Sequence, residues 1–183
     1  NMNVGKGINF IIKLKEQDVD NRLEFHFMGN AYYDFRYNKL GIQHGQYKRS
    51  EFNDIVESID PMFIGIFSIW PETYCHTLTE AWSTGVPVLT MDIGALGERV
   101  KNNGGGYIVS DDPKEAYEQI INFVENKDEY VQVRKQIEDI KFPSTRDMAD
   151  AYLKIYEDEE KPSILITGLK EDYVNSNMTE NLI

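Results

Sequence analysis

Two glutamates flank a predicted helix start in the middle of the chain, and this arrangement could hold a charged ligand. The surrounding pattern predicts a strand that ends at Ile69 and a helix that begins near Tyr74. The first N–H groups of a helix have no intrahelical partners, and the helix dipole adds positive potential there. An anion such as phosphate is therefore favoured at this point. Thr73 and Thr77 can add hydroxyl donors.

The glutamates are Glu72, which precedes this helix, and Glu80, which lies one turn after His76 on the same helical face. Because helix side chains lean towards the N-terminus, both carboxylates can point at a ligand over the helix start. An ionised carboxylate only accepts hydrogen bonds, and it can receive both O–H groups of a diol. The pattern therefore suits a phosphate between two polyols, which is the layout of a nucleotide sugar.

The same glutamates also have an ordinary structural interpretation. The 183 residues include 31 Asp and Glu, so a pair of glutamates at any one spacing arises easily by chance. Glu72 could simply stabilise a helix N-terminus, and Glu80 could belong to a solvated helix face. Spacing alone leaves both interpretations open.

The elements that would position these residues follow an alternating order of strands and helices. The expected strands cover residues 23–29, 42–44, 62–69, 86–91 and 107–109, and the expected helices cover residues 6–17, 50–58, 77–84, 97–101, 113–124, 130–140 and 146–156. This order indicates repeated βαβ units and a parallel α/β sheet. Ligands of such sheets bind outside the carboxyl ends of the strands. The loops to inspect therefore follow Met28, His44, Ile69, Met91 and Val109.

Composition excludes several classes of protein. Lys and Arg number 19 against 31 Asp and Glu, so the formal net charge is −12. A domain this acidic lacks the electrostatic footprint of a duplex nucleic-acid binder, and anionic lipid would repel it. The longest apolar run, near residues 62–70, is shorter than the roughly 20 residues of a membrane span. We expect a cytoplasmic protein, which other parts of a longer protein could bring to the inner face of a membrane.

A change of composition suggests where the main domain ends. The charge cluster at residues 157–161 precedes Pro162, and we expect one domain over residues 1–162. Residues 163–183 would be a tail or the start of a further module. Asn1 stands before Met2, and the chain enters a helical pattern almost at once. We therefore expect it to be a piece of a longer protein.

Four other features could do chemistry but favour a structural interpretation. Cys75, the single cysteine, excludes an internal disulfide; it could be an activated thiolate, but no Cys–His–Asn arrangement accompanies it. The three histidines share no metal-ligand spacing, so no metal site is expected. The glycines at 104–106 precede a strand, as a simple turn does. The aromatic residues at 32–37 could stack on a base or sugar, but such a cluster is more typical of a packed loop.

An ordered set of motifs gives the glutamates a more specific context. They are Lys6-Gly7, Phe27-Met28-Gly29, Gly45-Gln46-Tyr47-Lys48, Glu72, Glu80-Ala81, Gly85-Val86-Pro87-Val88 and Glu98. From about Lys6 to Tyr156 the chain resembles, in register, the C-terminal domain of retaining GT-B glycosyltransferases of group 1 (family 4). The stretches HGQYKRSEF and SIWPETYCHTLTEAW are most similar to those of large cell-surface polysaccharide transferases.

The resemblance implies a Rossmann-like parallel sheet that binds the donor, a nucleotide-diphosphate sugar. Glu72 would accept hydroxyls of the donor sugar, and Glu80 would accept the ribose diol. Lys6 would contact the diphosphate and stabilise the leaving nucleotide, which makes Lys6 and Glu72 the catalytic candidates. The further donor-binding candidates are Gly45 and Tyr47 beside the base, and Thr73, Tyr74, Cys75, His76 and Thr77 at the helix start.

The same resemblance implies transfer of the sugar to a glycan acceptor, with retention of configuration and without cofactor or bound metal. The acceptor would bind to an N-terminal domain that is missing from this chain, so we expect the piece alone to be inactive. Binding of nucleic acid is not expected.

Three departures from the family pattern leave other functions open. Cys75 stands where the family has Gly, and His76 stands where it has an apolar residue. The family's phosphate-binding Arg, about five residues before Lys6, has no counterpart, so donor affinity should be weakened. The alternatives are a degenerate, non-catalytic scaffold domain and, less favoured, a GT-B sugar-nucleotide epimerase.

Overall fold

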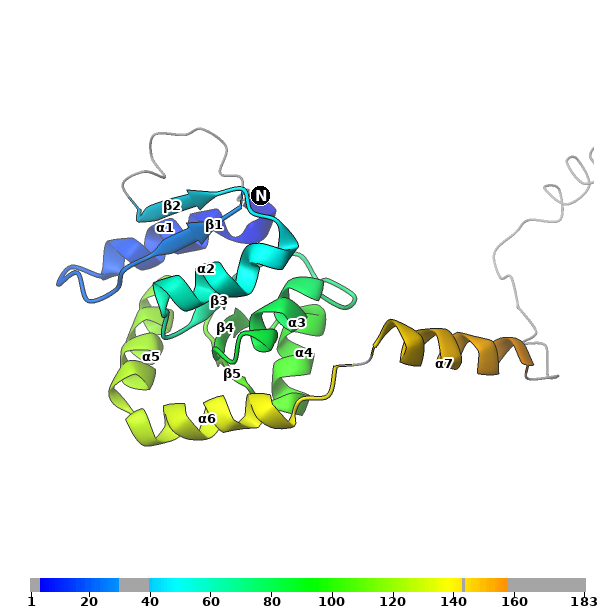
Figure 1. Ribbon diagram of the computed structural model, residues 1–183. Coiled ribbons are helices and arrows are strands. Elements are labelled where there is room, and N and C mark those ends of the chain that lie inside the picture. Colours follow the sequence, from blue (N-terminus) through cyan, green and yellow to red (C-terminus); the bar gives the residue numbers. More distant parts are fainter. Residues whose placement is uncertain (1–3, 30–39, 143, 158–183) are drawn as a thin grey trace, which may run out of the picture. The chain divides into compact units, whose positions relative to one another are not determined.

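A computed structural model describes residues 4–29, 40–142 and 144–157 of the chain (Figure 1). It divides the chain into two compact units, Asn1–Phe142 and Pro143–Ile183. The predicted boundary at residue 162, the tail after it and the aromatic cluster at residues 32–37 lie outside the described residues. No described helix is long and apolar enough to cross a membrane.

The first unit is built on parallel strands. Three of them, β3 (Ile64–Ile66), β4 (Val88–Met91) and β5 (Gly106–Val109), form a sheet in that order. The strands β1 (His26–Met28) and β2 (Ile42–Gly45) form a separate parallel pair. The predicted α/β fold with parallel sheets is confirmed.

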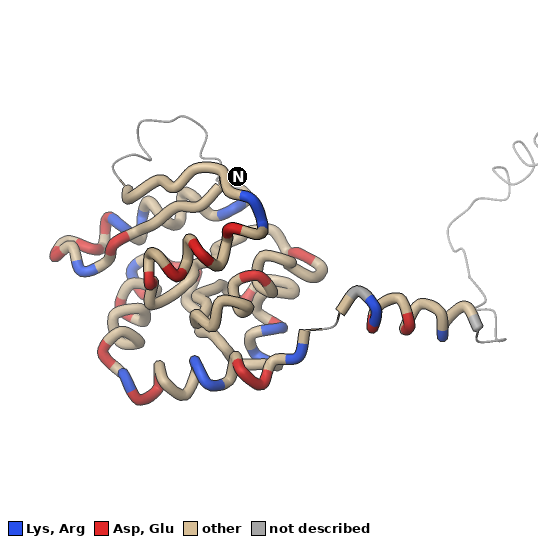
Figure 2. Tube along the Cα trace, viewed as in Figure 1, with Lys and Arg blue, Asp and Glu red and all other residues tan. Residues whose placement is uncertain are grey.

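Each predicted helix is present, although some of the boundaries differ. The first unit contains α1 (Ile8–Gln17), α2 (Phe52–Ile59), α3 (His76–Ser83), α4 (Gly94–Asn103), α5 (Pro113–Glu125) and α6 (Lys127–Asp139), with short 3-10 helices η1 (Val4–Lys6) and η3 (Arg49–Glu51). The second unit contains α7 (Thr145–Glu157). Acidic and basic residues are interspersed along these helices, and the described part of the chain carries no continuous stripe of basic residues (Figure 2).

Four expected elements were wrong by three residues at one end, among them the strand at 23–29, which is β1, and the helix at 130–140, which is α6. The expected strand at 62–69 reduces to Ile64–Ile66, because the chain beyond it pairs with η1 instead: the Ile69 N–H donates to the Gly5 carbonyl at 3.1 Å. The expected short helix at 97–101 is the ten-residue α4. Glycine is unfavourable within a helix, so Gly94 and Gly97 favoured the shorter expected element. In the structure both lie in close contact with neighbouring loops.

Helices cover both faces of the three-stranded sheet. Alternate side chains of a strand point to opposite faces, and all four residues of β4 are buried. Leu89 and Met91 pack with buried residues of α1 and α5, whereas Val88 packs with buried residues of α3 and α4. This burial on both faces explains why β4 is apolar at every position except the buried Thr90.

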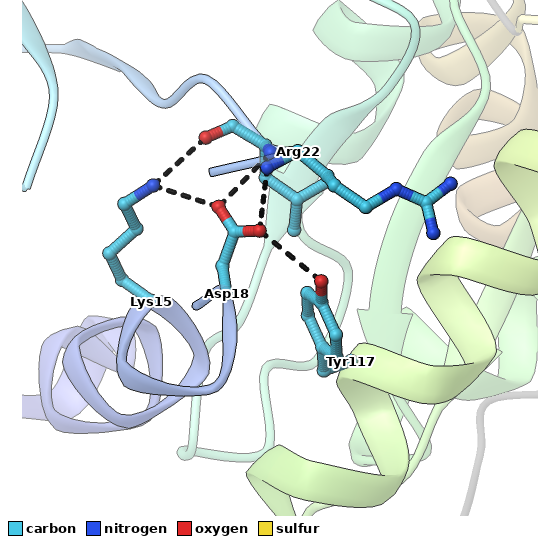
Figure 3. Close-up of polar contacts among 5 residues, drawn as sticks. Lys15, Asp18, Arg22 and Tyr117 are labelled. Atoms are coloured by element: carbon cyan, nitrogen blue, oxygen red, sulfur yellow. Dashed lines mark hydrogen bonds and ion pairs between the residues drawn. The ribbon is translucent and has the colours of Figure 1, made fainter. Parts of the chain in front are cut away.

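A buried carboxylate ties the end of α1 to α5. Asp18 is only 3% exposed. Its carboxylate pairs with the Lys15 ammonium at 2.8 Å and accepts from the N–H groups of Arg22 and Leu23 and from the Tyr117 hydroxyl (Figure 3). Burial by itself raises the pKa of Asp18, but these donors outweigh it and hold the pKa below its ordinary value. The carboxylate is therefore ionised and stabilises the fold at neutral pH.

We expect Asp18→Asn to lower the free energy of unfolding at pH 7 by about 2–3 kcal/mol, because hydrogen bonds to a buried charge are lost. A carboxyl group whose pKa is lower in the folded than in the unfolded protein stabilises the fold at pH values above its unfolded-state pKa. This stabilisation is lost as the pH falls through the folded-state pKa. The loss of unfolding free energy in the variant should therefore become smaller as the pH falls below 3.8, the ordinary pKa of the group. Urea denaturation at a series of pH values measures both effects. Exposed Asp20→Asn is the control, and an equal deficit at every pH would contradict the prediction.

Candidate functional site

The candidate site begins where η1 lies against the end of β3. Gly7 adopts a left-handed φ of +77°, and a Cβ built on it would lie 1.9 Å from the Phe67 carbonyl oxygen. Just before it, the Gly5 carbonyl accepts from the Ile69 N–H at 3.1 Å and from the Ser68 hydroxyl at 3.3 Å. Only glycine allows this contact, which gives a physical reason for the Lys-Gly motif.

The approach of the two backbones brings Lys6 to Glu72. The Lys6 ammonium lies 2.5 Å from the Glu72 carboxylate. This hydrogen bond holds the pKa of Glu72 below its ordinary value, against the effect of burial, and hydrogen bonds from Cys75 and Ser68 act in the same direction. Glu72 is therefore an ionised acceptor, in the state that binding sugar hydroxyls requires.

The N-terminus of α4 fixes the backbone of the Glu72 loop. The Ala95 N–H donates to the Glu72 carbonyl at 2.9 Å. A Cβ at Gly94 would lie 2.9 Å from the Cα of Pro71, so α4 reaches this loop only because residue 94 has no side chain. Sequence reasoning missed Gly94, which it left in the loop between the expected strand at 86–91 and the expected helix at 97–101.

Cys75 has the backbone conformation that glycine adopts most easily. It lies in the left-handed region with φ +62°, directly before the first residue of α3. Its side chain is 5% exposed, and burial together with the hydrogen bond to Glu72 raises the pKa of the thiol to about 11. At neutral pH the thiol is protonated, so the structure favours the structural interpretation of Cys75 over an activated thiolate.

The start of α3 is open to solvent, as the anion-site prediction requires. The helix begins at His76, between the two starts expected from the sequence. Thr73, His76 and Thr77 are exposed, and Tyr74 is 41% exposed. The residues around the helix start are therefore exposed, as a bound anion over its first N–H groups would require.

Glu80 lies on the next turn of α3 and pairs with Arg49 of η3. The Arg49 Nε atom is 2.7 Å from the Glu80 carboxylate, and Arg49 is 77% exposed. Sequence reasoning missed Arg49, although it stands in the basic run after Tyr47. A groove of about 500 Å³ lies beside this pair and is lined in part by Phe52 and Thr79.

The base-side loop comes close to Glu80. The ring of Tyr47 packs 5.6 Å from that of Phe52. Burial raises the pKa of the Tyr47 hydroxyl, and the charge of Glu80 adds to the effect. Gly45 ends β2, and its carbonyl accepts from the Gly29 N–H at 2.8 Å. The structure thus places Tyr47 on Phe52, which shares a groove with Glu80, and brings Lys6 to Glu72.

Two of the three histidines meet across β1 and β2, which their sequence spacing did not indicate. The ring nitrogens of His26 and His44 lie 2.9 Å apart, and the other nitrogen of His26 lies 2.7 Å from the Glu24 carboxylate. His76 instead lies against the Tyr74 ring. Among the described residues, no group of three or more His, Cys, Asp or Glu could hold a metal ion.

Comparison with known proteins identifies the family. The family model described as "Glycosyl transferases group 1" matches residues 5–139. The chain belongs to the group 1 glycosyl transferases. The match includes Lys6, both glutamates of the site and Glu98, which is exposed on α4. No curated protein sequence shows significant similarity to the chain.

Solved structures of glycosyltransferases have the same fold. HepE of Anabaena, in complex with UDP and glucose, has a TM-score of 0.69 at 14% identity, over 86% of this chain and 46% of its own. A glycosyltransferase from Rickettsia africae has a TM-score of 0.62 at 18% identity, over 89% of this chain and 47% of its own. The chain therefore spans slightly less than half the length of these proteins. The resemblance to the C-terminal domain of a group 1 GT-B enzyme is confirmed at the level of fold.

We expect Gly7→Ala to be far more destabilising than Gly85→Ala. Both glycines have φ above +70°, but a Cβ at Gly85 meets nothing within 4 Å. Gly85→Ala should therefore cost only the left-handed backbone conformation, about 1–2 kcal/mol. Gly7→Ala adds a clash with the Phe67 carbonyl and should cost more than about 3 kcal/mol. Thermal and urea unfolding measure the difference, and equal costs would show that the approach of η1 is not tight.

Proposed function

We propose that this chain is the donor-binding half of a retaining glycosyltransferase, which transfers a sugar from a nucleotide-diphosphate sugar to a glycan. One observation carries the proposal: two carboxylates, each with a basic residue beside it, lie before and within the exposed N-terminal turns of one helix. Such a site offers acceptors for two polyols and positive potential for a phosphate between them.

Tyr47 packs on Phe52, which lines the same groove as Glu80, and this supports a ribose and base on this side of the helix start. Glu72 would then receive the hydroxyls of the donor sugar on the other side. The N–H groups of residues 74–77 would face the diphosphate. Charge that develops on the leaving nucleotide would be stabilised by these N–H groups and by Lys6, which is how preorganised donors lower a barrier.

The ion pairs within the site are suited to exchange. Lys6 is 51% exposed and Arg49 is more exposed still, whereas the carboxylate partners, at 25% and 24%, are largely shielded. The basic side chain of each pair can therefore turn towards a ligand while the carboxylate stays in place.

The reaction would need a second domain. The structural neighbours are about twice as long as this chain, and the carboxyl-end loops described here would form only one wall of a cleft. An acceptor, taken to be a growing surface polysaccharide at the cytoplasmic face, would bind on the other wall. Glycosyl transfer should therefore require both halves. The HepE complexes contain UDP, glucose or UDP-glucose, which makes UDP-sugars the first donors to test here.

A specific observation supports one rival function, a degenerate scaffold domain. At residue 75 a buried cysteine occupies a left-handed conformation that favours glycine. A side chain at this point could obstruct the approach of a phosphate to the backbone. A scaffold would fold normally and bind no nucleotide sugar, so direct binding separates the two functions.

We expect Glu80→Ala and Glu72→Ala to weaken donor binding in different ways. Loss of an acceptor for the ribose diol should reduce affinity for both UDP and a UDP-sugar by about tenfold to a hundredfold. Loss of Glu72 should leave UDP binding nearly intact and remove the preference for the sugar-bearing ligand. Isothermal titration calorimetry with UDP and UDP-glucose, followed by other nucleotide sugars, measures these constants.

The matched control for both variants is Glu118→Ala, which removes one negative charge from the exposed side of α5. Its affinities should equal those of the unaltered chain. If both site variants change the affinity for both ligands equally, the assignment of separate roles is wrong. If the unaltered chain binds no nucleotide sugar of the panel, the scaffold function is favoured instead.

Donor binding should not depend on a divalent metal. Lys6 and the helix start would supply the positive charge that a metal provides in other transferases. We expect the dissociation constant for UDP to be the same with EDTA as with added magnesium or manganese. Affinity that appears only with the metal would overturn this assignment of charges.

A further inference from the structure

Arg99 of α4 makes a set of contacts with the start of α3 that the proposed roles do not use. Its Nη1 atom donates to the carbonyls of Tyr74 and Cys75, at 2.8 and 3.1 Å. Its Nη2 atom donates to the Thr79 hydroxyl at 2.9 Å. The guanidinium carbon lies 4.3 Å from the centre of the Tyr74 ring and 5.2 Å from that of Trp82.

These contacts determine where the neighbouring N–H groups point. In a trans peptide the carbonyl and the following N–H point in opposite directions. Because Arg99 holds the carbonyls of Tyr74 and Cys75, the N–H groups of Cys75 and His76 point away from the guanidinium. The Cys75 carbonyl also accepts from the Leu78 N–H at 3.2 Å, so the His76 N–H is directed out of the helix start.

The chemistry of these contacts requires an arginine. A guanidinium is a planar fork that can reach several acceptors at once, and it stacks on aromatic rings. A lysine at this position keeps the charge, but its compact ammonium cannot reproduce the fork. The hydrogen-bond acceptors found for Arg99 among the described residues are two carbonyls and a hydroxyl, so its charge is not neutralised by them.

We propose that Arg99 is a positioning residue for the anion site: it holds the Tyr74–Cys75 backbone so that the N–H groups of Cys75 and His76 face a bound diphosphate. The proposal rests on the proposed donor site. Through the same contacts Arg99 keeps Cys75 in its left-handed conformation and leaves a positive charge behind the helix start, where it favours an anion.

A first experiment measures the positioning without any ligand. Cys75 is the only cysteine of the chain and is buried, so its alkylation by iodoacetamide reports on the loop that Arg99 holds. We expect Arg99→Met and Arg99→Lys to raise the alkylation rate under native conditions by about tenfold, as expected when hydrogen bonds that close the loop are lost. Thr79→Val removes a single acceptor and keeps nearly the same side-chain shape. It should therefore give a smaller rise in the alkylation rate.

The control variant is Lys101→Met. Lys101 lies on the same helix and pairs with Asp92 in an exposed position, so this change removes one positive charge from α4 without touching the loop. Its alkylation rate should equal that of the unaltered chain. Melting temperatures measured in parallel separate a local opening from general unfolding, and if Arg99→Met does not fold, Arg99→Lys and Thr79→Val decide. If the variants that fold are alkylated at the rate of the unaltered chain, the proposal is overturned.

A second experiment measures UDP affinity by calorimetry. Arg99→Lys should weaken UDP binding by about tenfold, because the charge remains but the N–H groups are no longer held. Lys101→Met should stay within about twofold of the unaltered chain. Full affinity in Arg99→Lys would show that charge alone matters and would overturn the positioning role. If the unaltered chain binds no UDP, the proposed donor site fails, while the alkylation rates still decide what Arg99 holds.

Discussion

The site depends above all on the contact between the backbone of Gly7 and the carbonyl of Phe67. The absence of a Cβ lets η1 lie against the end of β3, so that residues beyond Ile66 pair with Gly5 rather than extending the sheet. This places the Lys6 ammonium beside the Glu72 carboxylate. The backbone of Glu72 is held in turn by a hydrogen bond from the start of α4. A lysine and a carboxylate 66 residues apart thus owe their proximity to two glycines, at positions 7 and 94.

An acidic chain can still bind an anion when its positive groups are concentrated at one place. The net charge is −12, which disfavours phosphate ligands at long range. Screening in physiological salt limits that repulsion to about 8 Å, so the local groups decide. Lys6, Arg99 and the helix dipole of α3 all act at the loop before His76. Each of the two glutamates has a basic partner there, and both are placed to act as acceptors for hydroxyl groups.

Much of the fold could be predicted from the sequence, because apolar periodicity and glycine positions are local signals. The order and type of the strands and helices followed from them, and the ordered motifs around Glu72 and Glu80 indicated the family. Contacts that depend on the folded arrangement could not be predicted. Arg99 reaches carbonyls 24 and 25 residues away, and His26 meets His44 across two strands. The pairing of Arg49 with Glu80 likewise joins residues whose types alone fit many partners.

The departure at residue 75 is best understood together with Arg99. A cysteine with φ +62° carries a conformational cost of about 1–2 kcal/mol that a glycine would avoid. Three kinds of contact offset it: burial of the thiol against the core around Leu78, its hydrogen bond to Glu72, and the grip of Arg99 on the adjoining carbonyls. The side chain that replaces glycine therefore points into the protein, and the N–H groups point out. The cysteine can thus be tolerated without closing the helix start to a phosphate, which favours a donor site over a scaffold.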